Sequence, residues 1–167
     1  MDAKLRHILL VEDDPRDVEL TLEALAEQNL ANNVTTARNG EEALDYLHRR
    51  GKFKTRAEGN PIVVLLDLKM PKVTGLEVLR QMKSHPQLRM IPVVVLTSSR
   101  EEPDLAECYA LGVNAYVVKP IGFQEFFGAV KELGVFWAIV NEPPPGTPKA
   151  KPDDSASNTM VEIPNKA

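Results

Sequence analysis

Five short apolar runs, separated by longer segments of helical periodicity, limit the folds open to this chain more than any other feature. Branched residues dominate the runs, which occupy positions 8–11, 34–37, 62–66, 93–96 and 115–118. Four of the five are almost continuously hydrophobic, which is typical of strands buried on both faces of a parallel sheet. The strict alternation of strands and helices predicts an α/β fold with a doubly wound, five-stranded parallel sheet.

Helix signals fall between these runs. Asp14 and Pro15 have the pattern of an N-cap followed by a first-turn proline, with Asp17 as an acid at the third helical position. Asn39 begins a second helix in a similar way. The last helical segment is more apolar than one sheet-facing stripe requires. It contains Phe123, Phe126, Phe127, Val130, Leu133, Val135, Phe136 and Trp137.

Composition argues against several classes of protein. The 167 residues carry 20 basic and 24 acidic side chains, a formal net charge of -4, which disfavours binding to nucleic acid or an anionic membrane through a large positive patch. No apolar run approaches the length of a membrane span. The lone Cys108 cannot form an internal disulfide. We therefore expect a soluble, cytoplasmic protein that contacts neither nucleic acid nor membrane.

Proline usage divides the chain. Residues 1–142 have the composition of one domain, whereas residues 143–167 hold six prolines and no aromatic side chain. Such a composition predicts a disordered tail rather than a second domain. We therefore expect no DNA-binding domain within these residues.

Polar residues follow four of the five predicted strands. Glu12 and Asp13 end the first run, Asp67 the third and Thr97 the fourth, and Lys119 follows the fifth. The carboxyl ends of parallel strands form the ligand-binding edge of such a sheet. Three carboxylates crowded there suit Mg²⁺, and a carboxylate beside that metal can accept a phosphoryl group to form an aspartyl phosphate. A hydroxyl and an ammonium would stabilise the charge on the phosphoryl oxygens.

Four segments, at positions 8–14, 65–71, 95–99 and 116–120, resemble the receiver domains of bacterial two-component response regulators. The likeness covers about residues 5–140 and implies a (βα)5, flavodoxin-like receiver fold. It also implies that Asp67 accepts phosphate from a histidine kinase. Glu12, Asp13, Asp67 and the backbone carbonyl of Lys69 would then hold Mg²⁺. Glu12 stands where the family commonly has Asp, which is compatible with a metal contact through water.

The resemblance assigns further roles near the last two strands. Lys119 would contact the phosphoryl group, and the bond from Lys119 to Pro120 would be cis. Thr97 would move toward the phosphate while Tyr116 turns inward, and the small Ser98 would leave the acceptor accessible. We expect the Lys69 side chain either to tune the attacking water or to be a solvated loop lysine.

Within the family, the chain resembles the single-domain regulators, and particularly those that partner bacterial phytochrome-type kinases. It rests on the long polar loop at 51–60 and on Phe136 and Trp137 before the proline-rich segment. The surplus of apolar residues in the last helix either packs entirely in the core or leaves some of them on an outer face. The second arrangement predicts a homodimer or partner surface on the fourth helix, fifth strand and fifth helix. The residues of this predicted dimer face are Tyr109, Phe123, Phe127, Phe136 and Trp137.

Two other functions remain open from the residues alone. Phosphatases of the haloacid dehalogenase type also use a strand-end aspartate and Mg²⁺, but they place an acid two residues later, where this chain has Lys69. The second alternative is an interaction module with the receiver fold that works without phosphorylation. The presence of Asp67, Thr97 and Lys119 together argues against it.

Overall fold

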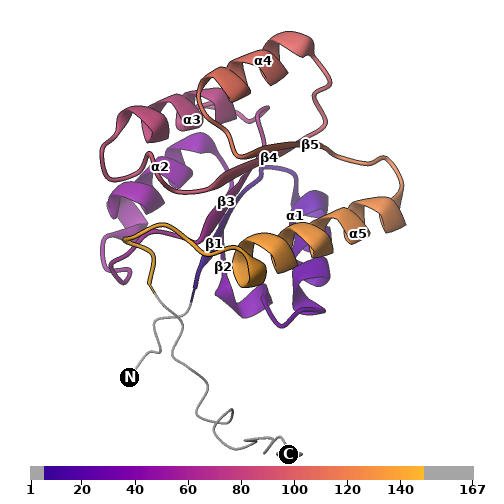
Figure 1. Ribbon diagram of the computed structural model, residues 1–167, viewed down its shortest axis with the longest axis horizontal. Coiled ribbons are helices and arrows are strands. Elements are labelled where there is room, and N and C mark those ends of the chain that lie inside the picture. Colours follow the sequence, from indigo (N-terminus) through magenta and orange to yellow (C-terminus); the bar gives the residue numbers. More distant parts are fainter. Residues whose placement is uncertain (1–5, 149–167) are drawn as a thin grey trace, which may run out of the picture.

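The protein is described by a computed structural model, which covers residues 6–148. Five parallel strands form one sheet in the order β2-β1-β3-β4-β5, with helices on both faces (Figure 1). This confirms the predicted fold class. The elements are β1 Ile8–Val11, α1 Pro15–Ala26, β2 Val34–Ala37, α2 Gly40–His48, β3 Val63–Leu66, α3 Gly75–Ser84, β4 Val93–Thr97, α4 Glu102–Ala110, β5 Ala115–Val118 and α5 Phe123–Gly134.

The sheet separates two apolar cores. Helices α1 and α5 cover one face, and α2, α3 and α4 cover the other (Figure 1). Alternate residues of β1 enter opposite cores: Leu9 and Val11 face α2 and α3, whereas Ile8 and Leu10 face α1 and α5. All four are at most 2% exposed. Continuous hydrophobicity in a central strand therefore reflects burial on both sides.

Side-chain caps fix the starts of the helices that border the acidic edge. The Asp14 carboxylate accepts a hydrogen bond from the Arg16 backbone N–H, and Pro15 is the first residue of α1. The Asn39 side chain accepts from the Glu42 N–H at 2.8 Å at the start of α2. Both predicted N-caps are confirmed. Each satisfies a backbone donor that has no partner inside its helix.

Close backbone contact fixes the start of α3 against the end of β3. A Cβ atom added to Gly75 would lie 2.0 Å from the Asp67 carbonyl oxygen and 2.7 Å from the Leu68 Cα. The Gly75 N–H donates to the Leu68 carbonyl at 2.9 Å. Only a residue without a side chain fits here, so the glycine sets the position of the loop that carries Asp67.

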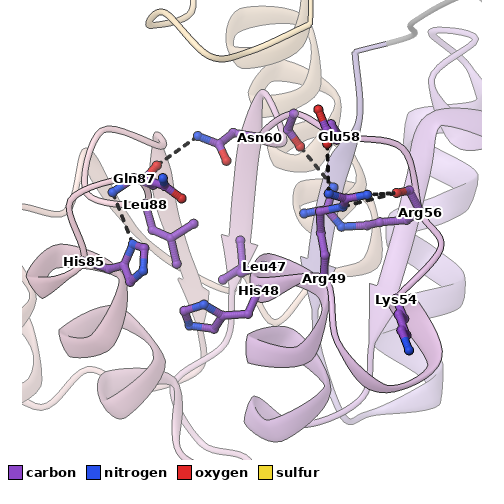
Figure 2. Close-up of a pocket in the computed structure, with 11 residues that line it drawn as sticks. Leu47, His48, Arg49, Lys54, Arg56, Glu58, Asn60, His85, Gln87 and Leu88 are labelled. Carbon is purple, nitrogen blue, oxygen red and sulfur yellow. Dashed lines mark hydrogen bonds and ion pairs between the residues drawn. The ribbon is translucent and has the colours of Figure 1, made fainter.

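The long connection between α2 and β3 is held by arginines rather than left open. The Arg56 guanidinium lies over the Tyr46 ring at 4.2 Å and donates to the Tyr46 and Gly59 carbonyls. Arg49 donates in turn to the Arg56 carbonyl and pairs with Glu58 (Figure 2). A polar cavity of about 570 Å³ lies between this loop and residues 85–88. Because it adjoins the amino end of β3, it lies at the opposite edge of the sheet from Asp67.

The carboxyl end of the domain differs from the prediction. A π-helical segment, Val135–Val140, continues α5. The first residues of the predicted tail, 143–148, lie against the α2–β3 loop, and a disordered tail stays a prediction. The Asn60 N–H donates to the Gly146 carbonyl at 3.1 Å, and Pro148 lies beside Gly59. These contacts give the proline-rich stretch a packing partner that its composition does not reveal. Residues 149–167 lie outside the described part.

Candidate functional site

Neighbouring strands bring the three predicted metal-ligating carboxylates together. Strands β1 and β3 pair directly, and the Asp67 N–H donates to the Val11 carbonyl at 3.0 Å. Oxygen atoms of Glu12, Asp13 and Asp67 all lie within 4.8 Å of one another. Glu12 and Asp67 are buried, whereas Asp13 is exposed. The carboxyl edge of the sheet therefore forms the predicted acidic cluster.

Glu12 is committed to partners within the protein. Its Oε1 accepts from the Asp14 N–H at 3.1 Å, and its Oε2 accepts from the Lys119 ammonium at 2.5 Å. Burial raises the pKa of the Glu12 carboxyl to about 8, and the Asp67 charge adds to the rise, although the Lys119 hydrogen bond opposes it. A carboxylate so held is poorly placed to bind a metal with both oxygens, which agrees with a contact through water.

The Lys119 ammonium contacts three carboxylates. It lies 2.5 Å from Glu12 Oε2, 2.8 Å from Asp17 Oδ2 and 3.3 Å from Asp67 Oδ2. Burial alone would lower the pKa of Lys119, but the hydrogen bonds to Asp17 and Glu12 and the nearby Asp67 charge raise it above its ordinary value. Lys119 is therefore a permanent cation. Sequence reasoning placed Asp17 only at a helix start, since nothing local predicts a contact 102 residues away.

The donor set and charge of the cluster fit a hard divalent cation. Glu12, Asp13, Asp17 and Asp67 supply four carboxylates, and Lys119 is the one cationic side chain in ion-pair contact with them among the described residues. Oxygen ligands of this kind suit Mg²⁺, Mn²⁺ or Ca²⁺. A hollow of about 460 Å³ adjoins the cluster and is lined by Asp13, Lys69, Pro71 and Glu101 among others. Solvent and small ions can reach the exposed Asp13 from it.

Two further predictions concern Lys69, which follows the phosphoacceptor strand, and the peptide bond before Pro120. The Lys69 N–H donates to Asp67 Oδ1 at 3.4 Å, while its ammonium lies 3.6 Å from Glu101 on the rim. The prediction of a cis peptide bond between Lys119 and Pro120 is wrong, because this bond is trans. Before proline, the trans isomer is lower in free energy than the cis isomer by about 0.5–1 kcal/mol. The Lys119 ammonium reaches the Asp67 carboxylate with the trans bond in place.

Thr97 and Tyr116 meet at a residue that the sequence did not single out. Thr97 is fully buried, and its Oγ1 accepts from the Ser99 N–H at 3.3 Å. The Tyr116 hydroxyl donates to the Ser99 carbonyl at 3.0 Å. Ser99 itself is 4% exposed and donates through its hydroxyl to Asp104, whereas the predicted Ser98 is exposed. The backbone of one residue, Ser99, thus contacts both predicted switch residues: its N–H donates to Thr97 and its carbonyl accepts from Tyr116.

Comparison with known proteins identifies the family. The model of the response regulator receiver domain matches residues 8–131, which include every residue of the acidic cluster. This chain belongs to the response regulator receiver domain family.

Relatives of this receiver domain include other response regulators, and some of the similar solved structures are of phytochrome response regulators. Response regulator Rcp1 of Synechocystis sp. is 38% identical, with 78% of this chain and 87% of Rcp1 covered. The structure of the phosphorylated cyanobacterial phytochrome response regulator RcpA is 40% identical with a TM-score of 0.79, covering 84% of this chain and 99% of that one. The bacteriophytochrome response regulator RtBRR is 62% identical, with a TM-score of 0.67 and 86% of both chains covered.

A solved structure of a receiver relative contains a metal. The Mn²⁺-bound form of Rcp1 is 36% identical to this chain, with a TM-score of 0.78, and covers 83% of this chain and 99% of that one. Taken with the clustered carboxylates, this similarity points to binding of a divalent metal by this receiver domain.

The predicted dimer face divides into exposed and packed residues. Tyr109 on α4, Phe123 on α5 and Phe136 are 55%, 57% and 48% exposed, whereas Phe127 and Trp137 pack against the core. The sequence analysis missed Ile139 and Val140, which are 53% and 64% exposed. They were missed because the sequence of an apolar helix end is the same whether its side chains pack in the core or face solvent.

No helix among residues 6–148 has the length and apolar character needed to cross a membrane.

Proposed function

We propose that this receiver domain is the phosphorylated element of a two-component system and that Asp67 is its phosphoacceptor. The carrying observation is the placement of the Asp67 carboxylate. It is 9% exposed, lies 3.3 Å from the Lys119 ammonium and shares a 4.8 Å cluster with Glu12 and Asp13. The Asp67 carboxylate therefore lies beside both a cation and the two other acids proposed to bind metal.

The reaction needs an in-line displacement at phosphorus. One oxygen of Asp67 attacks the phosphorus of a phosphohistidine, an O–P bond forms, and the P–N bond to the kinase imidazole breaks, with the electron pair leaving on that nitrogen. The Lys119 ammonium, which already contacts Asp67 Oδ2, stabilises charge on the phosphoryl oxygens. Thr97 supplies a buried hydroxyl beside the next strand end. The chain acts once per phosphoryl group rather than as a turnover enzyme.

We assign Mg²⁺ to the acidic cluster. Glu12, Asp13 and Asp67 would hold it together with the Lys69 carbonyl, and the Mn²⁺-bound form of Rcp1 supports this assignment. When bound, the metal neutralises charge on the transferring phosphoryl group. Cytoplasmic Mg²⁺ is abundant, and a reducing cytoplasm is compatible with the buried free thiol of Cys108.

A sensor histidine kinase of the phytochrome type is the proposed donor. The support is the set of phytochrome-linked relatives, one of which is 62% identical to this chain. Phosphotransfer profiling tests this: each histidine kinase of the source organism is phosphorylated and mixed with the wild-type chain or with Asp67→Asn. We expect a phytochrome-type kinase to transfer fastest to the wild type and not at all to the variant. Faster transfer from an unrelated kinase would overturn the assignment.

The signal would leave through protein contacts, including a homodimer on the α4-β5-α5 face. The exposure of three large aromatic side chains, Tyr109 on α4, Phe123 at the start of α5 and Phe136 beyond its end, supports this proposal, since exposed apolar side chains mark interaction surfaces. A switch at Thr97 and Tyr116 lies next to that face and would alter its affinity. No nucleic acid contact is part of this output.

Sedimentation velocity tests the dimer. We expect the Phe123→Glu/Phe136→Glu double variant to remain monomeric at concentrations where the wild type dimerises. Met90→Glu is the matched control, because Met90 is 52% exposed but lies in the connection between α3 and β4. A wild type that stays monomeric at high concentration, with and without beryllofluoride, would refute the dimer.

A further inference from the structure

The Lys119 side chain extends across the carboxyl edge of the sheet to the start of helix α1. It follows β5, the edge strand, and its backbone N–H donates to the Thr97 carbonyl at 2.7 Å. Strands β4 and β3 separate β5 from β1, after which α1 begins. The Lys119 side chain crosses the ends of those strands and contacts Asp17 in the first turn of α1 at 2.8 Å. The side chain thereby connects the two sides of the acidic cluster.

All three ammonium hydrogens of Lys119 have a carboxylate partner. An ammonium offers three donors, and Glu12, Asp17 and Asp67 each accept one bond. The Lys119 side chain is 10% exposed, so water replaces these partners poorly. The bond to Asp67 is the longest of the three at 3.3 Å. In this arrangement the ammonium is held mainly by Glu12 and Asp17, rather than by the phosphoacceptor.

Asp17 is not occupied by its own helix. An acid at the third helical position often accepts a hydrogen bond from the N-cap backbone N–H, in a capping box. Here the Asp14 N–H donates to Glu12 Oε1 instead, and the hydrogen bonds of residues 6–148 include none from a backbone N–H of α1 to the Asp17 carboxylate. Its carboxylate, 27% exposed, is directed to Lys119. The helix-start role therefore leaves the observed contact unexplained.

We propose that Asp17 is a positioning residue of the phosphorylation site, which retains the Lys119 ammonium on the α1 side and so opposes formation of the phosphorylated state. This inference rests on the function proposed for Asp67. A phosphoryl group on Asp67 requires the Lys119 ammonium to move toward the new oxygens. The shorter bonds to Glu12 and Asp17 oppose that movement, since the bond to Asp67 is the longest of the three. Asp17 is the partner most easily released, because Glu12 is almost fully buried and Asp17 is partly exposed.

The first measurement uses the metal-free protein. Proton exchange of the Lys119 ammonium is followed in ¹H–¹⁵N spectra of lysine side chains for the wild type, Asp17→Asn and Glu23→Gln. Glu23 is exposed on the same helix and offers the same loss of charge without a contact to Lys119. Loss of one charge-assisted hydrogen bond is expected to speed exchange about threefold to tenfold in Asp17→Asn only. Equal exchange in all three proteins would overturn the proposal.

The second measurement titrates beryllofluoride, a phosphoryl mimic, at saturating Mg²⁺. We expect Asp17→Asn to bind it about threefold to tenfold more tightly than the wild type, with Glu23→Gln unchanged. Asp17→Ser is a second variant that keeps a side chain favourable at a helix start, and it should behave in the same way. Binding by the wild type with no gain in either Asp17 variant refutes the positioning role. Failure of the wild type itself to bind refutes the proposed function instead.

Discussion

The Tyr116 hydroxyl donates a 3.0 Å hydrogen bond to the backbone carbonyl of Ser99. The N–H of the same residue donates to Thr97 Oγ1 at 3.3 Å. A displacement of Thr97 toward a phosphoryl group must therefore release the Ser99 N–H or move Ser99, whose carbonyl Tyr116 contacts. Ser99 therefore connects the Thr97 and Tyr116 side chains through its backbone.

Thr97 and Tyr116 should be energetically coupled. Tyr116→Phe and Thr97→Val each remove one hydrogen bond to Ser99 and should each lower the free energy of unfolding by about 1 kcal/mol. Because both bonds hold one residue, the double variant should deviate from additivity by at least about 0.5 kcal/mol. Urea denaturation of the four proteins measures this coupling. Strict additivity would show that Ser99 does not connect the two side chains.

Two glycines should respond in opposite ways to alanine. Gly75→Ala brings a Cβ against the Asp67 carbonyl and should lower the free energy of unfolding by about 1–3 kcal/mol. Gly128→Ala, inside α5 with no atom within 4 Å of the added Cβ, should raise it by about 0.5–1 kcal/mol. Thermal and urea unfolding compare the two. A neutral Gly75→Ala would mean that the loop carrying Asp67 adapts freely.

The Cys108 thiol should be inert in the folded protein. Burial, followed by the charges of Asp104 and Glu107, raises its pKa from 9.0 to about 11. A rise of this size reduces the thiolate fraction at neutral pH by about a hundredfold, in addition to the steric effect of full burial. Labelling by a thiol reagent should be slow in buffer and fast in urea. Rapid labelling of the folded chain would contradict the burial of Cys108.

The same thiol contributes to the pH dependence of stability. Its folded pKa is raised above the unfolded value, so its protonated form favours the folded state. This contribution is fully present below about pH 9 and is lost as the pH rises toward about 11. Cys108→Ala should show a shallower loss of unfolding free energy across that interval than the wild type. Parallel curves for the two proteins would contradict the shift.

The two acids after β1 should differ as metal ligands. Both Glu12 oxygens already accept hydrogen bonds, from Asp14 and Lys119, whereas Asp13 is exposed at the rim of the adjoining hollow. Asp13→Asn should therefore weaken Mn²⁺ binding by about tenfold or more, and Glu12→Gln should weaken it less. Isothermal titration calorimetry provides the comparison. A larger loss in Glu12→Gln would place the metal deeper in the cluster than the hydrogen bonds allow.

The local signals of the sequence were sufficient for the fold and for most of the acidic cluster. Continuous apolar runs identified the buried strands, and parallel pairing then brought Glu12, Asp13 and Asp67 to one edge. Asp14 and Asn39 were recognised as caps because capping depends on neighbours in the chain. These features are either local or follow from strand order alone.

Contacts across the sheet were beyond such signals. Asp17 contacts Lys119 only because the lysine side chain extends over the ends of two strands. Ser99 connects Thr97 and Tyr116 only because the hydroxyls of both side chains contact its backbone. The hydrogen bond from the Asn60 N–H to the Gly146 carbonyl likewise joins segments far apart in the chain, and the proline content of residues 143–167 gives no sign of it. The trans bond at Pro120 corrects an expectation drawn from the family resemblance rather than from this chain.

The proposed function depends above all on the transfer of a phosphoryl group to Asp67. Incubation with acetyl phosphate and Mg²⁺, followed by intact-mass measurement and borohydride reduction to map acyl phosphates, tests it most directly. We expect one base-labile phosphoryl group at Asp67 in the wild type, none in Asp67→Asn and none without divalent metal. A wild type that stays unmodified, or a phosphoryl group mapped to another residue, would contradict it.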